Sequence, residues 1–387
     1  MAAGDQNAAD PRAVAARYSA YLQDERLLAD PAISVLMWTY NHRPYIEQAI
    51  ESVLAQRTQY SFELVISDDC STDGTTEILK DYQKRYPEKI RLILSTRNMW
   101  KDGDITGRLL AQGRGKYSAL HHGDDYWTDP LKLQKQAELM EAEPGLSGCF
   151  TNAAIENESG ESAPSVYLGD GPPQSLGPKR KQPYLRQADI VEGLLVPTCT
   201  VFMRTELMRN LPEWMLRVPT GDWGIAMVLT RRGPLKYLDE ITAMYRRHSG
   251  GTWSSLLVLD KISRGVARMD VYRPYADPAL VPVLDAALRR QRNELRRHGT
   301  GLLAMWLKKN GLPGFDSRQK QLAKYFGGRE YRQVRLAALE RFFQQAYFKK
   351  NAREARQRLL ALMGWHPEWL FRKGSLGQVL RALAGRI

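Results

Sequence analysis

The stretch that decides the fold spans residues 117–127 and reads YSALHHGDDYW. A short apolar run ends here in two adjacent carboxylates, Asp124 and Asp125, which is typical of the point where a buried parallel strand stops. In open α/β sheets, ligands bind outside the carboxyl ends of the strands, and carboxylate oxygens at such a point suit Mg²⁺ or Mn²⁺. The alternative is an Asp-Asp turn that caps the helix predicted near Pro130.

The same arrangement occurs upstream, where apolar runs lead into polar turns and then into helical patterns. The expected strands are 33–38, 62–67, 90–94 and 117–120, and the expected helices are 44–56 and 75–85. Buried strands that alternate with helices predict a mainly parallel sheet with right-handed crossovers. The sequence therefore indicates a Rossmann-like α/β fold in which the polar turns share one edge of the sheet.

The order and spacing of three stretches resemble those of family 2 glycosyltransferases with the GT-A fold. The stretches are residues 34–41, 63–75 and 115–136, and the similarity covers about residues 32–253. The resemblance implies an inverting, metal-dependent transferase that moves a sugar from a nucleotide-diphosphate sugar to a glycan, lipid-linked or protein hydroxyl. Enzymes of this kind serve bacterial surface polysaccharide or glycoconjugate synthesis.

The resemblance also implies which residues hold the nucleotide, with a UDP-type donor favoured. The matching positions are Thr39, Tyr40, Asn41, Asp69, Arg97, Arg108 and Asp124. An aromatic face at Tyr40 and a carboxylate at Asp69 that accepts a base N–H are a sound way to discriminate a base. The alternative for Asp69 is a turn residue in front of a helix that Ser71 or Asp73 caps.

The acidic metal motif of the family maps onto Asp124 and Asp125, so Asp125 is the expected ligand of Mn²⁺ or Mg²⁺. His248, in a late glycine-containing loop, is expected to complete the metal shell or to contact phosphate. Relatives carry an acid where His122 stands, and histidines beside a site are more often hydrogen-bonded spacers. We therefore do not expect His121 or His122 to bind the metal.

Inverting transfer also needs a base that takes the proton from the acceptor hydroxyl. The stretch 219–224, PTGDWG, resembles the acceptor-side segment of these enzymes and makes Asp222 the expected catalytic base. The alternative is an Asp222 N-cap for a helix over 223–230, with Trp223 in the core. We assign sugar, acceptor or phosphate contacts to Trp127, Trp223, Arg246 and Arg247; for the two arginines, a basic surface hairpin is the alternative.

Composition and length agree with an enzyme of two or three structural units, because 387 residues with 43% hydrophobic residues can bury a large core. We expect a helical N-terminal extension over 1–30, with a helix over about 11–28 that packs on a catalytic domain over 31–254. Residues 31–125 would form its nucleotide-binding half and 126–254 its acceptor half. No apolar run approaches the about 20 residues of a membrane span, and the first 30 residues lack a signal-peptide core. The three cysteines have no metal-ligand spacing, which favours a reducing, cytoplasmic location.

The positive charge lies at the C-terminus: residues 255–387 carry 27 Lys and Arg against 10 Asp and Glu, and the rest carries 29 against 33. Helices are expected there over 286–298, 301–309, 331–349, 352–363 and 377–384. Such a basic helical domain suggests peripheral contact with the anionic inner face of a membrane. A solvated face, a homodimer interface and a platform for a protein acceptor are alternatives.

The sequence gives less support to other classes of function. No nucleic-acid reader motif is present, and the Gly-x-Gly-x-x-Gly turn of a dehydrogenase is missing after the first strand. An inactive nucleotide-sugar-binding or scaffold protein that uses the basic tail remains the second hypothesis. The acids Asp69, Asp125 and Asp222 argue against it, since all three are present.

Overall fold

The computed structural model describes residues 19–100, 104–158, 165–166, 183–193, 196–251, 253, 256–310, 336, 338–339, 342–343 and 352–365. The chain divides into two units, Met1–Ser254 with Asp270–Leu284, and Ser255–Met269 with Asp285–Ile387. Residues 270–284 therefore belong with the catalytic unit, whereas the sequence analysis placed them in the C-terminal domain.

In the described part of the first unit, eleven strands form one mixed sheet in the order β1-β4-β3-β2-β5-β10-β7-β11-β6, with β8 on β7 and β9 on β11. The strands are β1 (Ser19–Leu22), β2 (Ile33–Thr39), β3 (Phe62–Asp68), β4 (Ile90–Ser95), β5 (Tyr117–His122), β6 (Tyr126–Trp127), β7 (Gly148–Asn157), β8 (Ser165–Val166), β9 (Tyr184–Leu185), β10 (Phe202–Arg204) and β11 (Leu235–Arg247). β2 pairs in parallel with β3 and β5, and β3 in parallel with β4. The polar turns after these strands therefore share the carboxyl edge, as expected.

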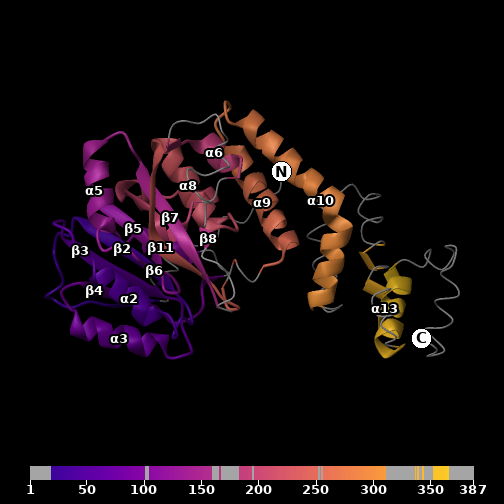
Figure 1. The fold of residues 1–387 in the computed structure, drawn as a ribbon, viewed down its shortest axis with the longest axis horizontal. Helices are drawn as coiled ribbons and strands as arrows, with labels where there is room; N and C mark the ends of the chain where they lie inside the picture. The colour runs from indigo at the N-terminus through magenta and orange to yellow at the C-terminus, as the bar shows by residue number, and fades with distance from the viewer. Residues whose placement is uncertain are drawn as a thin grey trace, which may run out of the picture. The chain divides into compact units, whose positions relative to one another are not determined.

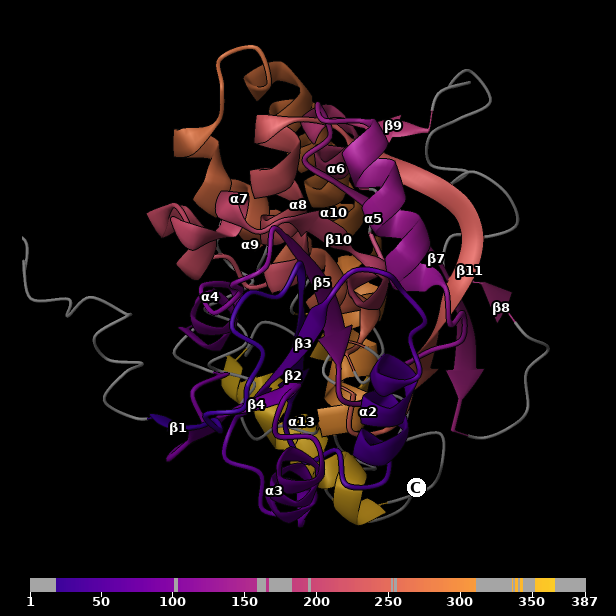
Figure 2. The ribbon, with the colours of Figure 1, turned by 90° about the vertical axis from the view of Figure 1, so that its left-hand side faces the viewer.

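Helices follow most of the strands (Figure 1). They are α2 (Ile46–Leu54), α3 (Thr75–Arg85), α4 (Asp104–Leu110), α5 (Lys132–Ala142), α6 (Gln187–Val191), α7 (Glu206–Arg209) and α8 (Gly221–Arg232), with short 3₁₀ turns at Thr198–Thr200, Glu213–Leu216 and Arg273–Tyr275. Figure 2 shows α2 and α3 beside the strands of the N-terminal half and α8 beside α6.

The parallel half forms because its strands are mainly apolar and are buried on both faces. Every residue of β2 and of β3 is buried. The helix α2 buries Ile46, Ala49, Ile50 and Val53, a spacing of three and four residues that places them on one face. β10 then runs antiparallel between β5 and β7, and β7 pairs in parallel with β11. The result is the GT-A-like α/β architecture that the sequence predicted.

The N-terminal segment differs from its expectation. Residues 19–22, inside the helix expected over 11–28, form β1, which pairs antiparallel with β4. β4 would otherwise be an edge strand with unpaired N–H and C=O groups, and this pairing satisfies them. Residues 1–18 lie outside the described residues.

The second unit is helical where it is described. Its helices are α9 (Val258–Tyr272, which continues into the first unit), α10 (Val281–Asn310) and α13 (Ala352–Trp365). The helices expected over 286–298 and 301–309 are one helix, α10, because an isolated glycine such as Gly299 costs only about 1 kcal/mol inside a helix. The segment 377–384 and most of 331–349 lie outside the described residues. Among the described helices, none has the length and apolarity that a bilayer crossing requires.

Candidate active site

The turns after β2 and β3 are joined at the carboxyl edge of the sheet. Asn41 and Cys70, with φ of 53° and 66°, are the non-glycine residues with positive φ in the described chain. The Asn41 N–H donates to Ser71 Oγ (2.8 Å), and Asn41 Oδ1 accepts the Thr72 N–H (2.8 Å). Such backbone strain persists only where surrounding bonds hold it, and it clusters at functional sites.

Thr39 and Tyr40 stand on these turns. Thr39 is buried, and its Oγ1 lies 3.2 Å from His42 Nδ1. The ring of Tyr40 is 42% exposed. An exposed aromatic ring beside buried polar groups is free to stack on a planar ligand.

Asp69 is a buried acid that orders a neighbouring loop. Its carboxylate accepts the N–H groups of Met99 (2.8 Å) and Trp100 (3.0 Å). Burial raises the pKa of Asp69. Asp73 accepts the Thr75 N–H at the start of α3, as the alternative of a capped turn expects, while Asp69 itself bonds the loop after β4.

Arg108 is placed differently from the expectation of a nucleotide contact. Its side chain is buried and donates to Ser67 Oγ (3.1 Å), to Ser95 Oγ (2.7 Å) and to Ser19 Oγ. The guanidinium therefore ties β1, β3 and β4 together beneath the turns, and we withdraw it from the nucleotide-binding set. Arg97 is exposed on the loop after β4.

The loop after β5 brings Asp124 against two imidazoles. Gly123 donates its N–H to the Trp38 carbonyl (2.8 Å), and a Cβ at Gly123 would lie 2.6 Å from Thr39 Oγ1. This close approach places Asp124 Oδ2 3.1 Å from His248 Nε2 and 3.7 Å from His42 Nε2. Burial opposes ionisation of Asp124, but the hydrogen bond from His248 and the nearby imidazoles outweigh it and lower its pKa well below the usual range.

Asp125 is almost fully buried, and the Arg246 backbone N–H donates to its Oδ1 (3.0 Å). Burial raises the pKa of Asp125, and so does the neighbouring charge of Asp124. Neither aspartate caps α5, because Asp129 accepts the Leu131 N–H at its start. The alternative of a simple capping turn is therefore wrong.

A candidate metal centre lies in this loop. Within the described residues, one ligand atom each from His122, Asp124 and Asp125 lies within 4.8 Å of the other two. The sequence analysis did not assign His122 to the metal and did not single out His42. Only the folded sheet brings these imidazoles and the aspartates together at its carboxyl edge, and no single segment of the sequence shows this. His121 is different, since it is fully buried and burial lowers its pKa to about 3.

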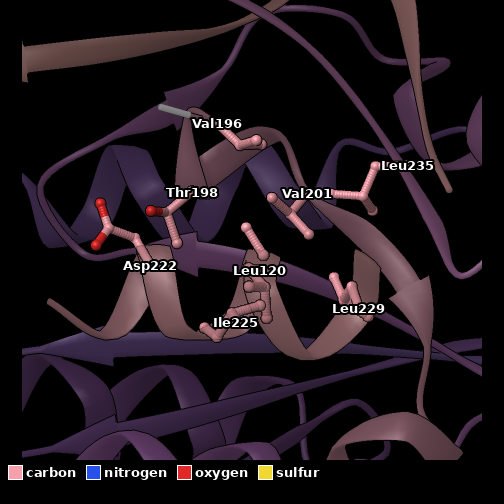
Figure 3. Close-up of a pocket in the computed structure, with 9 residues that line it drawn as sticks. Leu120, Val196, Thr198, Val201, Asp222, Ile225, Leu229 and Leu235 are labelled. Atoms are coloured by element: carbon pink, nitrogen blue, oxygen red, sulfur yellow. The ribbon is translucent and has the colours of Figure 1, made fainter. Parts of the chain in front are cut away.

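Asp222 lines a recess between α8 and β5 (Figure 3). The recess holds about 240 Å³ of space, open solvent at its mouth included, and its walls are Leu120, Val196, Thr198, Val201, Asp222, Ile225, Ala226, Leu229 and Leu235. The Asp222 carboxylate and the Thr198 hydroxyl stand at one end, and Leu229 and Leu235 stand at the other. Burial opposes protonation of His122, but the carboxylates of Asp125, Asp124 and Asp222 outweigh it and raise its pKa. The acids at 125 and 222 thus act on the same imidazole.

Asp222 is not the N-cap of its helix. α8 begins at Gly221 after Thr220, which places Asp222 in the first turn. A carboxylate there is stabilised by the positive end of the helix dipole.

Trp127 and Trp223, which we assigned to sugar or acceptor, are core residues. Trp127 is 4% exposed and donates Nε1–H to the Cys199 carbonyl (2.8 Å). Trp223 is 2% exposed and donates to the Ile190 carbonyl (3.3 Å). Neither side chain is exposed enough to stack on a ligand, because both indoles are buried in the core, where their large apolar area stabilises the fold.

Arg246 is engaged within the protein. Its guanidinium donates to Glu156 (2.8 Å), to the Asp124 carbonyl (3.2 Å) and to Gln48. It therefore holds the aspartate loop, whereas we had expected a phosphate or sugar contact. Arg247 is exposed at the end of β11.

Comparison with known proteins agrees with this architecture. The model for Glycosyl transferase family 2 matches residues 34–208. A putative teichuronic acid biosynthesis glycosyltransferase of Bacillus subtilis, TuaG, is 37% identical over 221 residues, which cover 56% of this chain and 79% of TuaG. An uncharacterized protein of Mycobacterium tuberculosis is 32% identical over 223 residues, and the match spans 58% of this chain but only 61% of that relative.

Solved structures share the fold at low identity. Staphylococcus aureus TarS 1-349, in complex with UDP-GlcNAc, has a TM-score of 0.52 and 17% identity, over 82% of this chain and 91% of that one. The mannosyltransferase PcManGT from Pyrobaculum calidifontis, in complex with GDP-Man and Mn²⁺, has a TM-score of 0.51 and 16% identity, over 86% of this chain and 93% of that one.

Proposed function

The chain belongs to glycosyl transferase family 2, and on this premise we propose that it is an inverting, divalent-metal-dependent enzyme that transfers a sugar from a nucleotide-diphosphate donor to an acceptor hydroxyl. One observation carries the proposal: His122, Asp124 and Asp125 present ligand atoms within 4.8 Å of one another, and the charge of Asp222 also raises the pKa of this imidazole. Titratable side chains that shift one another's pKa in this way are typical of functional sites.

The donor would lie across the turns after β2 and β3. We propose that Tyr40 stacks on the base and that Asp69 accepts a base N–H with a lone pair that its two backbone bonds leave free. A uracil-type base is favoured. The complexes of TarS with UDP-GlcNAc and of PcManGT with GDP-Man support a nucleotide-sugar donor without choosing between bases.

The residues of the aspartate loop fit a divalent cation, because two carboxylates and an imidazole present ligand atoms within 4.8 Å of one another. Asp125 and its neighbour Asp124 would hold the ion. A bound cation would neutralise charge that develops on the leaving nucleoside diphosphate. Arg246 keeps both aspartates in place through its backbone N–H and its guanidinium.

Asp222 would take the proton of the acceptor. In a single in-line displacement, the acceptor oxygen forms a bond to the anomeric carbon while the bond from that carbon to the diphosphate oxygen breaks. The hydroxyl proton passes to the Asp222 carboxylate, and the electron pair of the broken bond stays on the nucleoside diphosphate. The apolar walls of the recess beside Asp222 would limit the water that competes with the acceptor for the sugar.

The acceptor is proposed only by class. We propose a glycan, lipid-linked or protein acceptor in surface glycoconjugate assembly, and the name of TuaG, from teichuronic acid biosynthesis, supports a role in this kind of pathway. For a lipid-linked acceptor, the basic segment 255–387 would attach to anionic lipid, and flotation with anionic vesicles at low salt tests this point.

The test of the function is a transfer assay with a panel of nucleotide sugars in the presence of Mn²⁺. We first identify the donor by its effect on the melting temperature, and then compare Asp222→Asn with the parent protein. Loss of the base should lower kcat by roughly 10²–10⁴-fold while donor affinity stays within a few-fold.

Asp81→Asn is the matched control, because Asp81 is an exposed acid on α3 that forms a surface ion pair with Arg85 one turn along the same helix. This variant removes one negative charge from an exposed position on α3 and should leave turnover unchanged. Equal turnover in Asp222→Asn and Asp81→Asn would remove Asp222 from the mechanism.

A further inference from the structure

The candidate metal centre contains nitrogen as well as oxygen. His122 ends β5, and its Nδ1 lies 3.7 Å from Asp125 Oδ2. The side chain is 35% exposed, so it is open to a ligand and not sealed in the core. His248, directly after β11, and His42, in the turn after β2, approach the other aspartate, Asp124.

The spacing of the inner three residues suits one ion. Ligands bound at about 2.1 Å to an octahedral ion lie about 3.0 Å apart when adjacent and about 4.2 Å apart when opposite. The ligand atoms of His122, Asp124 and Asp125 all fall within 4.8 Å of one another, so small side-chain movements would close them around a cation. Among the described residues, His42 and His248 lie outside this group of ligand atoms, and their Nε2 atoms lie 3.7 Å and 3.1 Å from Asp124 Oδ2.

Ligand chemistry decides which cation such a centre prefers. Mg²⁺ is a hard ion that favours oxygen ligands and keeps several waters, whereas imidazole suits Mn²⁺, Co²⁺ and Zn²⁺ increasingly well. We propose that His122 is a nitrogen ligand and that the centre selects transition-metal dications over Mg²⁺. His42 and His248 are positioning residues that orient Asp124. The inference rests on the metal dependence within the proposed function, and it adds the ligand set and the metal preference.

The full-length protein, freed of metal, is titrated with Mn²⁺, Co²⁺ or Mg²⁺ alone in a calorimeter. We expect Mn²⁺ and Co²⁺ to bind at least about tenfold more tightly than Mg²⁺. His122→Asp, which replaces the nitrogen by a carboxylate, should narrow the ratio of Mn²⁺ to Mg²⁺ affinity by about the same factor. Equal affinities of the parent protein for Mn²⁺ and Mg²⁺ would overturn the proposal.

Electron spin echo envelope modulation of bound Mn²⁺ identifies the nitrogen directly. The ¹⁴N modulation of a coordinated imidazole should be present in the parent protein, lost in His122→Asp and retained in His248→Asn. His248→Asn should weaken Mn²⁺ binding by roughly 10–100-fold, as loss of an orienting partner does. Modulation that disappears in His248→Asn but persists in His122→Asp would overturn the assignment, as would its absence from the parent protein.

These readouts need no sugar transfer, so they separate the inference from the proposed function. Nitrogen coordination in a protein that transfers no sugar would support the ligand assignment and contradict the enzymatic role. Transfer that proceeds at full rate with no bound cation would support a transferase and overturn the metal inference. Far-ultraviolet circular dichroism confirms that each variant is folded before its affinity is compared.

Discussion

A methyl group added at Gly123 should uncouple the candidate metal loop from the sheet. The Cβ of Gly123→Ala would lie 2.6 Å from Thr39 Oγ1, 2.9 Å from His42 Nδ1 and 2.9 Å from Ile46 Cδ1, whereas ordinary contact begins at 3.4 Å. All three neighbours are held in place: Thr39 and His42 contact each other, and Ile46 is fully buried in α2. The loop itself must therefore move away.

The expected displacement is about 0.5–1 Å, the difference between these separations and ordinary contact. Overpacking of this kind costs about 1–3 kcal/mol of unfolding free energy, part of it from the stretched Gly123 hydrogen bond to the Trp38 carbonyl. A shift of about 1 Å in a catalytic group lowers turnover on the order of 10²-fold. Activity should thus fall much further than stability.

Chemical denaturation measures the first quantity, and steady-state transfer with the identified donor measures the second. Gly145→Ala is the matched control, because a Cβ at Gly145 meets nothing within 4 Å. It should change neither stability nor activity measurably. If Gly123→Ala keeps kcat/KM within about twofold of Gly145→Ala, the close approach does not position the metal loop and the reasoning fails.

Three further outcomes are expected. Trp127→Phe should lose about 2–3 kcal/mol of unfolding free energy, because it leaves the Cys199 carbonyl unpaired and opens a cavity. The donor affinity measured by calorimetry should stay the same. Weaker donor binding without loss of stability would return Trp127 to the substrate site. Asp69→Asn should loosen the loop at Met99 and Trp100, because an amide has one oxygen where the carboxylate has two to accept these N–H groups. It should also weaken UDP binding about tenfold. Unchanged UDP affinity would exclude Asp69 from the nucleotide site. Burial lowers the pKa of Lys132 to about 8, below its value in the unfolded chain. Below about pH 8 the buried ammonium is charged and lowers the free energy of unfolding. This loss of stability decreases as the pH rises from about 8 toward the unfolded pKa. Lys132→Met should therefore be more stable than the parent at about pH 7, with a difference that narrows by about 1 kcal/mol by about pH 9 in urea melts; a constant difference would contradict a buried charge.

The order of strands and helices in the first half was predictable because its local signals agree. β2 and β3 are mainly apolar runs that contain Ser34 and, in β3, Glu63 and Ser67, and each ends in a turn whose residues suit positive φ or helix starts. Periodicity alone therefore located the carboxyl edge and the turns on it. The short strand β1 was not predictable, since its only reason to be extended is the free edge of β4, which is distant in sequence.

The roles of single residues were harder to predict, because one residue type serves both core and site. Glu63 and Asp69 are acids on the same strand-turn unit, yet Glu63 is fully buried in a pair with Arg114 (2.8 Å) and Ser34 (2.7 Å). Only its partners reveal that its role is structural. The same holds for Trp127 and Trp223, which lie next to site acids in sequence but direct their rings into the core. Side-chain direction depends on packing between segments, which no local pattern contains.

The hydrogen bonds between the turns after β2 and β3 have a consequence for ligand-binding kinetics. Asn41 bonds to Ser71 and Thr72, the His42 N–H donates to Thr75 Oγ1 (3.0 Å), and the Arg43 N–H donates to Asp73 (3.0 Å). The two turns therefore open only if four bonds break together, so their amide protons should exchange with solvent at one shared rate. The conformational entropy of the two turns is lost when the chain folds and not when the donor binds. The donor therefore meets a preorganised surface that does not need to close around it.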